Sequence, residues 1–233
     1  MILRVGIENN NDNRSIAWAL EHPGCFGYGS DAQDAEVAMQ QASREYAAWV
    51  RQHGMAWMDS DSVEVQVEET FDVYMAHPDP TEFPDARDYM VESFFHRDEQ
   101  PLSRLELERA GQLLEWSRQD LLRTVKGLSP ERLDQKYPGE RWSINGILNH
   151  VAHGEWFYQE RIGFPFPERE DDLPPEPLRA LELVRAHFRA ILPKLEGLDR
   201  VVELEGERWS PCKALRRATW HERDHTDHIR KLL

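Results

Sequence analysis

Cysteine is scarce in this chain of 233 residues, which contains only Cys25 and Cys212. The two lie nearly a chain length apart and form no CxxC pair or paired framework, so we expect reduced thiols in a cytoplasmic protein. Long apolar runs are also missing. No stretch approaches the length that crosses a bilayer, and the first residues lack the basic and apolar regions of a secretory signal. These absences predict a cytoplasmic localisation and no membrane partner.

Positive charge is scarce in the first part of the chain. The formal net charge is −15, and residues 1–77 contain 4 Lys and Arg against 13 Asp and Glu. Residues 78–100 contain 2 against 7, whereas residues 101–233 are almost balanced, with 22 against 23. An acidic surface repels phosphate backbones, so we expect no nucleic-acid partner. The change in charge near residue 100 predicts a domain boundary.

Short strands and one long helix are predicted in the acidic part. Ser30 or Asp31 can cap a helix that runs to about His53, and Gly54 is a typical helix stop. Alternating apolar residues and the turn residues between them predict short β-strands on either side of this helix. The strands are expected at residues 2–8, 14–20, 25–29 and 63–67.

The stretch Leu20–Gly54 resembles the HicB antitoxin family. It contains Pro23-Gly24-Cys25, then Gly29-Ser30-Asp31, then an Ala-rich helix. The resemblance implies a small ββαβ domain, related to part of ribonuclease H, over about residues 1–75. HicB proteins usually add a DNA-binding tail and pair with a small ribonuclease toxin. No such tail is visible here, so the resemblance implies a module for packing, dimerisation or binding of a protein partner.

Four amphipathic helices are predicted after residue 100. Prolines among acidic residues make 76–100 a linker with some local structure. The helices are expected at 103–126, 143–162, 177–192 and 211–231, with a crossover loop rich in Pro and acid at 164–177. The sequence therefore predicts an α+β chain, in which a four-helix bundle at 101–233 follows the small domain. Bundle cores commonly host metal sites built from facing helices.

Three histidines of the last helix are spaced to lie on one face. His221, His225 and His228 fall within a sector of about 60° at 100° per residue. Neutral imidazole is a common ligand of zinc, copper, iron and nickel. His150, on the second predicted helix, is the candidate for the ligand that completes a site. Its face also includes Gly154, which would let another helix approach closely.

The HExxH pattern of zinc metalloproteases also fits His221-Glu222 and His225. That pattern needs a third ligand downstream, six residues after the second His or on a later helix. Lys231 occupies the sixth position, and too little chain follows for a further helix. The third ligand must therefore come from upstream, which argues against the protease. Glu222 is about 100° from His221, so we expect a partner role for it and not that of a base.

Two segments together resemble the DinB-like superfamily. They are Trp142-Ser143 with His150 eight residues after the Trp, and Leu215-Arg216-Arg217 leading to His221-Glu222-Arg223-Asp224-His225. The resemblance spans about residues 101–233 and implies a four-helix bundle in which three histidines hold a divalent cation. By position these are His150, His221 and His225. The family includes thiol S-transferases and a maleylpyruvate isomerase. His228 departs from the pattern, since many members carry Gln there.

Further residues are candidates for a role beside the metal. Arg161 lies three turns after His150, and Arg217 lies one turn before His221, so both could dock a carboxylate or phosphate. His228 could be a fourth ligand, a neighbour of a ligand or a proton shuttle. Three protein ligands leave positions open for water or substrate. A cation there could polarise a carbonyl or lower the pKa of a bound water or thiol.

Two functions follow from these residues. The first is a metal-dependent transferase or hydrolase that acts on a small molecule, with zinc or nickel as the expected cation and thiol S-transfer among the reactions. The second is a module without catalytic activity, in which the metal stabilises the bundle and the first domain binds a protein partner or a second copy of the chain. The sequence identifies no substrate.

Overall fold

The chain forms two compact units in a computed structural model. The first unit contains Met1–Gln100 and Val201–Trp209, and the second contains Pro101–Arg200 and Ser210–Leu233. Segment 201–209 therefore belongs to the first unit, although it directly precedes the last helix of the second. The segment expected to be a linker, 76–100, also lies in the first unit. The structure describes residues 1–58, 63–77, 81, 88–167, 169 and 172–233.

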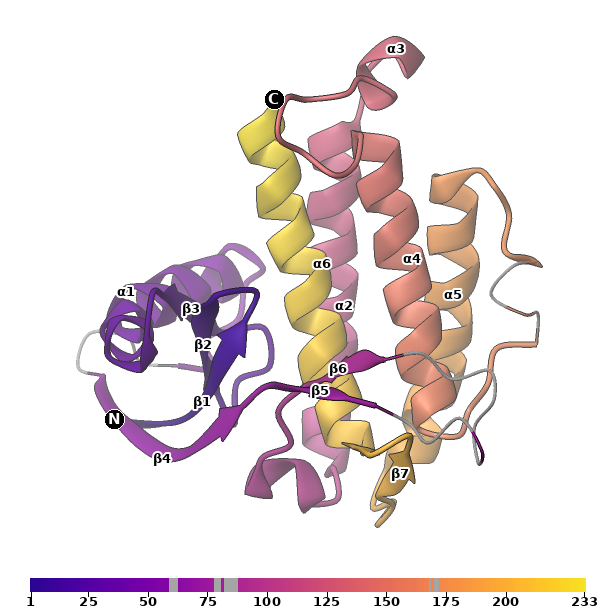
Figure 1. Cartoon of the computed structure of the whole chain (residues 1–233). Coiled ribbons are helices and arrows are strands. Elements are labelled where there is room, and N and C mark those ends of the chain that lie inside the picture. The colour runs from indigo at the N-terminus through magenta and orange to yellow at the C-terminus, as the bar shows by residue number, and fades with distance from the viewer. Residues whose placement is uncertain (59–62, 78–80, 82–87, 168, 170–171) are drawn as a thin grey trace. The chain divides into compact units, whose positions relative to one another are not determined.

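A four-stranded sheet forms the main body of the first unit (Figure 1). Its order is β3-β2-β1-β4, with antiparallel pairs between β3 and β2 and between β2 and β1, and a parallel pair between β1 and β4. The chain returns from β3 to the far edge of the sheet through helix α1. The bounds are β1 Ile2–Asn11, β2 Arg14–Ala19, β3 Phe26–Gly29, α1 Ala32–Gln52 and β4 Glu64–Asp72.

Helix α1 begins and ends at the residues that the sequence indicates. The carboxylate of Asp31 accepts a hydrogen bond from the backbone N–H of Asp34, which caps the first turn. Gly54, just beyond the last turn, has a φ of +79°, which favours glycine. The buried side of the helix packs against β3 and β2 through Ala35, Met39, Tyr46, Ala47 and Val50.

The first unit also contains two short hairpins and the 3-10 helix η1 (His96–Glu99). Strand β5 (Tyr74–Ala76) pairs with β6 (Tyr89–Val91), and β7 (Val202–Leu204) pairs with β8 (Glu207–Trp209), both in antiparallel fashion. The second hairpin is joined to the unit by side chains. The Tyr89 hydroxyl donates to the carbonyl oxygen of Leu204 at 3.0 Å, and Glu207 accepts from the backbone N–H of Glu92 at 3.2 Å. Pro78, Pro80 and Pro84 lie outside the described residues.

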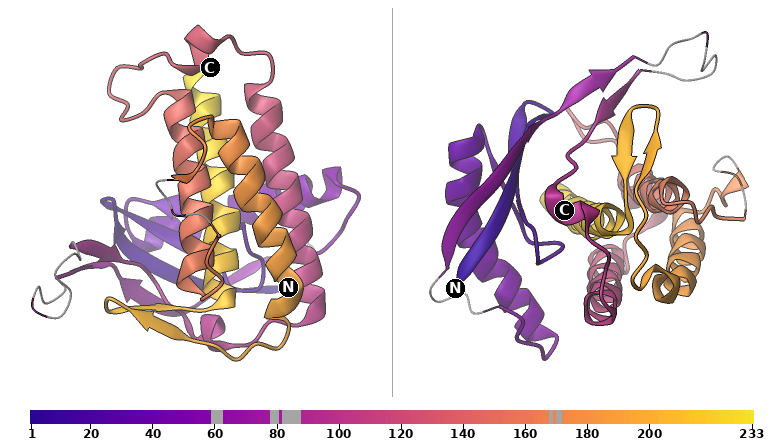
Figure 2. Two further views of the ribbon diagram at one scale, coloured as in Figure 1. Left: turned by 90° about the vertical axis from the view of Figure 1, so that its right-hand side faces the viewer. Right: turned by 90° about the horizontal axis from the view of Figure 1, so that it is seen from below.

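Four long helices run side by side in the second unit (Figure 1), and Figure 2 also shows them end-on. Helix α6 contacts both α2 and α4, and α4 also contacts α5. Ser103 caps α2, Ser143 caps α4 and Ser210 caps α6, each through its hydroxyl. The bounds are α2 Arg104–Val125, α4 Ile144–Arg161, α5 Pro177–Ile191 and α6 Pro211–Leu232, with the short helix α3 at Pro130–Leu133.

The predicted mixture of helix and sheet is confirmed, with the sheet in the N-terminal part and the long helices after residue 100. Apolar side chains from all four long helices fill the space between them, among them Leu121, Ile147, Val184 and Ile229. None of the helices in the described part of the chain is both long and apolar enough to cross a membrane.

Gly29 sets the close approach of α1 to the sheet, and this yields a stability prediction. A Cβ atom at Gly29 would lie 2.1 Å from the backbone nitrogen of Ala35, so backbone must move to accept it. We expect Gly29→Ala to lower the free energy of unfolding of the first unit by about 1–3 kcal/mol or more, as overpacking does. Urea denaturation followed by circular dichroism measures this change.

Gly111, within α2, provides the matched control. A Cβ atom there would meet only Leu192 at an ordinary 3.5 Å, so Gly111→Ala should be neutral or stabilising by up to about 1 kcal/mol. A Gly29→Ala protein as stable as the wild type would show that α1 and β3 are farther apart than described.

Candidate metal centre

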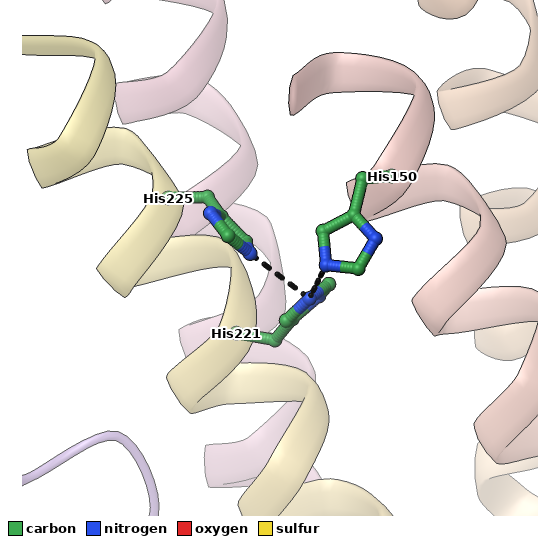
Figure 3. A group of neighbouring side chains, drawn as sticks. All are labelled: His150, His221 and His225. Carbon is green, nitrogen blue, oxygen red and sulfur yellow. Dashed lines mark hydrogen bonds between the residues drawn. The ribbon is translucent and has the colours of Figure 1, made fainter. Parts of the chain in front are cut away.

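Three histidines from two helices meet in the second unit. His150 belongs to α4, and His221 and His225 are one turn apart on α6. The Nε2 atom of His221 lies 3.0 Å from Nε2 of His150 and 3.1 Å from Nε2 of His225. One nitrogen from each ring lies within 4.8 Å of the others, as expected of a group that could hold a metal ion. Figure 3 shows the three rings pointing toward one point between the helices.

Gly154 makes room for this meeting of α4 and α6. It lies one turn after His150, on the helix face that the sequence predicts for it. A Cβ atom at Gly154 would lie 2.6 Å from Cε1 of His221 and 2.9 Å from its Nδ1, closer than real contacts allow. The missing side chain therefore accommodates the His221 ring, which is a more specific role than the close helix approach expected from the sequence.

Aromatic rings surround the histidines. The Trp142 ring stacks on His150, with centroids 4.5 Å apart and planes 23° apart, and the guanidinium carbon of Arg141 lies 4.6 Å above Trp142. The rings of Tyr158 and His221 form a T-shaped pair with centroids 6.0 Å apart. Trp142 is part of the sequence motif that resembles the DinB-like superfamily, but its contact with His150 is not predictable from spacing alone. The missing side chain of Gly146 lets Trp142 lie close to α4, because a Cβ atom at Gly146 would lie 2.9 Å from Cβ of Trp142.

Burial favours the neutral form of His150 and His221. It lowers the pKa of His150 below its usual value, and the charges of Arg141 and His153 lower it further. The pKa of His221 falls well below the usual range, because the ring is buried and lies beside His225, His150 and Arg217. At neutral pH both rings are therefore in the form that binds metals.

The other predicted candidates do not join the three histidines. The Nε2 atom of His228 lies 2.8 Å from a carboxylate oxygen of Glu140, and its ring is 6.1 Å from that of His225. Arg217 is fully buried, and its guanidinium carbon lies 5.5 Å from the Trp220 ring. Arg161 lies over Phe157 at 4.6 Å. Catalytic roles for His228, Arg217 and Arg161 remain predictions.

His153 and His187 are not part of the group. His153 is half-buried on α4. The Nδ1 atom of His187 lies 2.6 Å from the side-chain oxygen of Gln159, and its ring meets Phe166 edge-on at 5.2 Å. His187 therefore contacts Gln159 and Phe166 and not the three histidines.

Glu222 points away from the histidines into a buried cluster of charges. The cluster consists of Arg118, Glu155, Arg185 and Glu222, here termed the ion quartet. Arg118 Nε and the Ser117 hydroxyl donate to Glu222 at 2.5 Å each, and Arg185 donates to it at 2.8 Å. The partner role expected of Glu222 agrees with these contacts. Burial alone would raise the pKa of Glu222, but Arg118 and Arg185 lower it to about 2.

Arg118 and Arg185 were not singled out from the sequence. Each is a charged residue within the buried stripe of an amphipathic helix, between Leu114 and Leu121 on α2 and between Val184 and Phe188 on α5. A charge at a core position was the available signal, because buried charges need partners. The identity of the partners depends on tertiary packing and could not be taken from spacing.

The lowered pKa of Glu222 predicts a loss of stability in acid. The carboxylate stabilises the fold fully above its ordinary pKa of about 4.5, and this contribution disappears as the pH falls toward 2. Glu222→Gln should lower the free energy of unfolding at pH 7 by about 3 kcal/mol and should lose less stability than the wild type between pH 5 and pH 3. Urea denaturation of chelator-treated protein at each pH measures both effects. Equal pH dependence in the two proteins would contradict the prediction.

Comparison with known families agrees with the second resemblance. A model of the DinB superfamily matches residues 113–229, a segment that includes all three histidines and the whole ion quartet. Neither the curated proteins nor the solved structures include a significant match. The first 112 residues lie outside the family match, so the HicB resemblance remains a prediction. Because the match covers half of the chain, the chain belongs to the DinB superfamily.

Proposed function

We propose that the second unit is a divalent-metal-dependent enzyme acting on a small molecule, with His150, His221 and His225 as the metal ligands. The convergence of three Nε2 atoms carries this proposal. The family supports it, because the DinB superfamily has metal-binding members. The proposal includes a four-helix bundle formed by α2, α4, α5 and α6, as the resemblance implies.

The spacing of the nitrogens fits a shared cation. At a zinc–nitrogen distance of about 2.0–2.1 Å, two ligands are about 2.9 Å apart at a right angle and about 3.3 Å apart at the tetrahedral angle. The observed separations of 3.0 and 3.1 Å lie between these values. Neutral rings this close need a proton or a cation between their lone pairs, and one cation satisfies all three. Zinc and nickel are the metals that we expect.

Three protein ligands are typical of a catalytic site, because they leave a position open. A bound divalent cation would supply Lewis-acid chemistry to a small ligand at that position. The chain would contribute the aromatic walls formed by Trp142 and Tyr158. The buried guanidinium of Arg217 would favour an anionic group on the substrate. Transfer or hydrolysis is the reaction class, with thiol S-transfer as its first candidate.

A second function is favoured by the charge of the first unit. Residues 1–100 contain 6 Lys and Arg against 20 Asp and Glu. This imbalance suits a basic protein partner. In this alternative the first unit is a HicB-like interaction or dimerisation module, and the metal only stabilises the second unit.

Metal content tests the ligand set. Untagged wild-type protein should contain about one equivalent of divalent metal, and His150→Ala and His221→Ala should each lose it. His187→Ala is the matched control, because it removes a half-buried imidazole outside the group and should retain the metal. Elemental analysis of purified proteins provides the measurement. A wild type that takes up no zinc, nickel or manganese would refute the proposed site.

Access of small ligands to the metal distinguishes the two proposed functions, the enzyme and the interaction module. Cobalt-substituted protein should change its visible absorption when azide or a small thiol is added, because an open position can accept them. The same protein should transfer a low-molecular-weight thiol to a small electrophile or hydrolyse a small ester, and His221→Ala should lower either rate at least 100-fold. A cobalt spectrum that no added ligand perturbs would indicate a closed structural site and favour the alternative.

A further inference from the structure

The ion quartet takes one residue from each of the four long helices. Arg118 comes from α2, Glu155 from α4, Arg185 from α5 and Glu222 from α6. All four side chains are buried, with exposed fractions between 1% and 7%. The two carboxylates therefore belong to the helices that carry the histidines, and the two guanidinium groups belong to the helices that carry none of them.

Each arginine contacts both carboxylates. Arg185 donates through Nε and Nη2 to Glu155 at 2.6 and 3.0 Å, and Nη2 also donates to Glu222 at 2.8 Å. Arg118 donates through Nη2 to Glu155 at 2.9 Å and through Nε to Glu222 at 2.5 Å. Helices α4 and α6 are therefore linked twice, through two different arginines.

The quartet also forms hydrogen bonds with two backbone carbonyls and with the Ser117 hydroxyl, which donates to Glu222. Arg118 Nη1 donates to the carbonyl oxygen of Leu181 on α5 at 2.5 Å, and Arg185 Nη1 donates to that of Leu114 on α2. These two bonds also connect the arginine-bearing helices directly to each other. Because every member has several fixed partners, the network is compatible with only one arrangement of the four helices.

Stability alone does not account for such a network. Well-packed apolar side chains often replace a buried set of ion pairs with little loss of stability, because the charges must be desolvated. Apolar surfaces, however, can slide past one another, whereas a fixed set of charges cannot. A displacement of one helix by a single turn, about 5.4 Å, would break every ion pair that the quartet member on that helix makes. The best-supported use of a buried polar network is to fix register.

The same short segments of α4 and α6 carry the two carboxylates of the quartet and the histidine group. Glu222 directly follows His221 on α6, and Glu155 directly follows Gly154, whose missing side chain accommodates the His221 ring. The backbone positions that the arginines fix are therefore within one residue of those that bring α4 and α6 together. Any shift between the two helices moves His150 relative to His221 and His225.

We propose that the ion quartet is the positioning device of the metal centre. Arg118 and Arg185 hold Glu155 and Glu222 in one register, and this register sets the distance of His150 from the two histidines of α6. The proposal rests on the proposed function, since it concerns the same metal site. The four members are positioning residues and need not touch the metal or the substrate.

Cobalt(II) binding to the full chain tests the proposal, because the visible spectrum reports ligand geometry and not stability. Arg185→Met should weaken cobalt binding at least tenfold and change the absorption bands, as loss of groups that orient ligands does. Arg185→Lys keeps the charge but loses the planar fork that contacts both carboxylates. Compared with Arg185→Met, it should therefore recover more of the lost stability than of the lost cobalt affinity. If Arg185→Met does not fold, a variant in which Met replaces all four members takes its place in the cobalt measurement. Apolar replacement of a complete set of buried ion pairs often preserves stability.

Val184→Ala is the matched control. Val184 is a fully buried neighbour of Arg185 on α5, so its truncation destabilises the same core without removing a charge. It should lower the denaturation midpoint while leaving cobalt affinity and spectrum unchanged. Quartet variants that lose stability but retain wild-type affinity and spectrum would overturn the positioning role alone. A wild type that binds no cobalt would instead overturn the proposed function, and the positioning role with it.

Discussion

Four buried charges impose the strictest constraint on the second unit. Each ion placed in the interior costs several kcal/mol of desolvation, which only close and complete pairing offsets. Arg118, Glu155, Arg185 and Glu222 achieve that pairing only when α2, α4, α5 and α6 all occupy their observed places. The apolar residues around them supply most of the driving force for packing but would tolerate small displacements. Helix register in this unit is therefore an electrostatic property more than a hydrophobic one.

The constraint explains a sequence pattern that otherwise suggests a protease. In His221-Glu222 followed by His225, the two histidines lie on one helix face, and the glutamate lies about 100° away. In a protease of this pattern the glutamate serves as general base at the metal. Here Glu222 accepts hydrogen bonds from two arginines and a serine, which occupy its oxygens and hold it ionised. One turn of α6 thus carries two kinds of residue, histidines toward α4 and a carboxylate toward the core.

Local signals in the sequence predicted much of the fold. Ser103 and Ser143 mark the starts of α2 and α4, and alternation and turn residues located the four strands of the main sheet but not the hairpins formed by β5 to β8, because caps and periodicity act over a few residues. The meeting of His150 with His221 and His225 followed from helix spacing together with a family resemblance. The pairing within the ion quartet and the place of the 201–209 hairpin in the first unit did not follow. Both depend on contacts between residues far apart in the chain, for which one sequence contains no spacing rule.

Burial disfavours the charged form of both the histidines and Glu222, which means the protonated ring in one case and the ionised carboxylate in the other. For His150 and His221 it disfavours the protonated ring, so the lone pairs needed for a metal persist to lower pH than in free imidazole. For Glu222 it disfavours the carboxylate, but two adjacent guanidinium groups more than reverse that effect. The interior of this unit therefore favours a neutral imidazole at His221 and an ionised carboxylate at Glu222, next to each other on α6. Acid should therefore protonate His150 and His221 less readily than free imidazole, and Glu222 less readily than a free carboxylate.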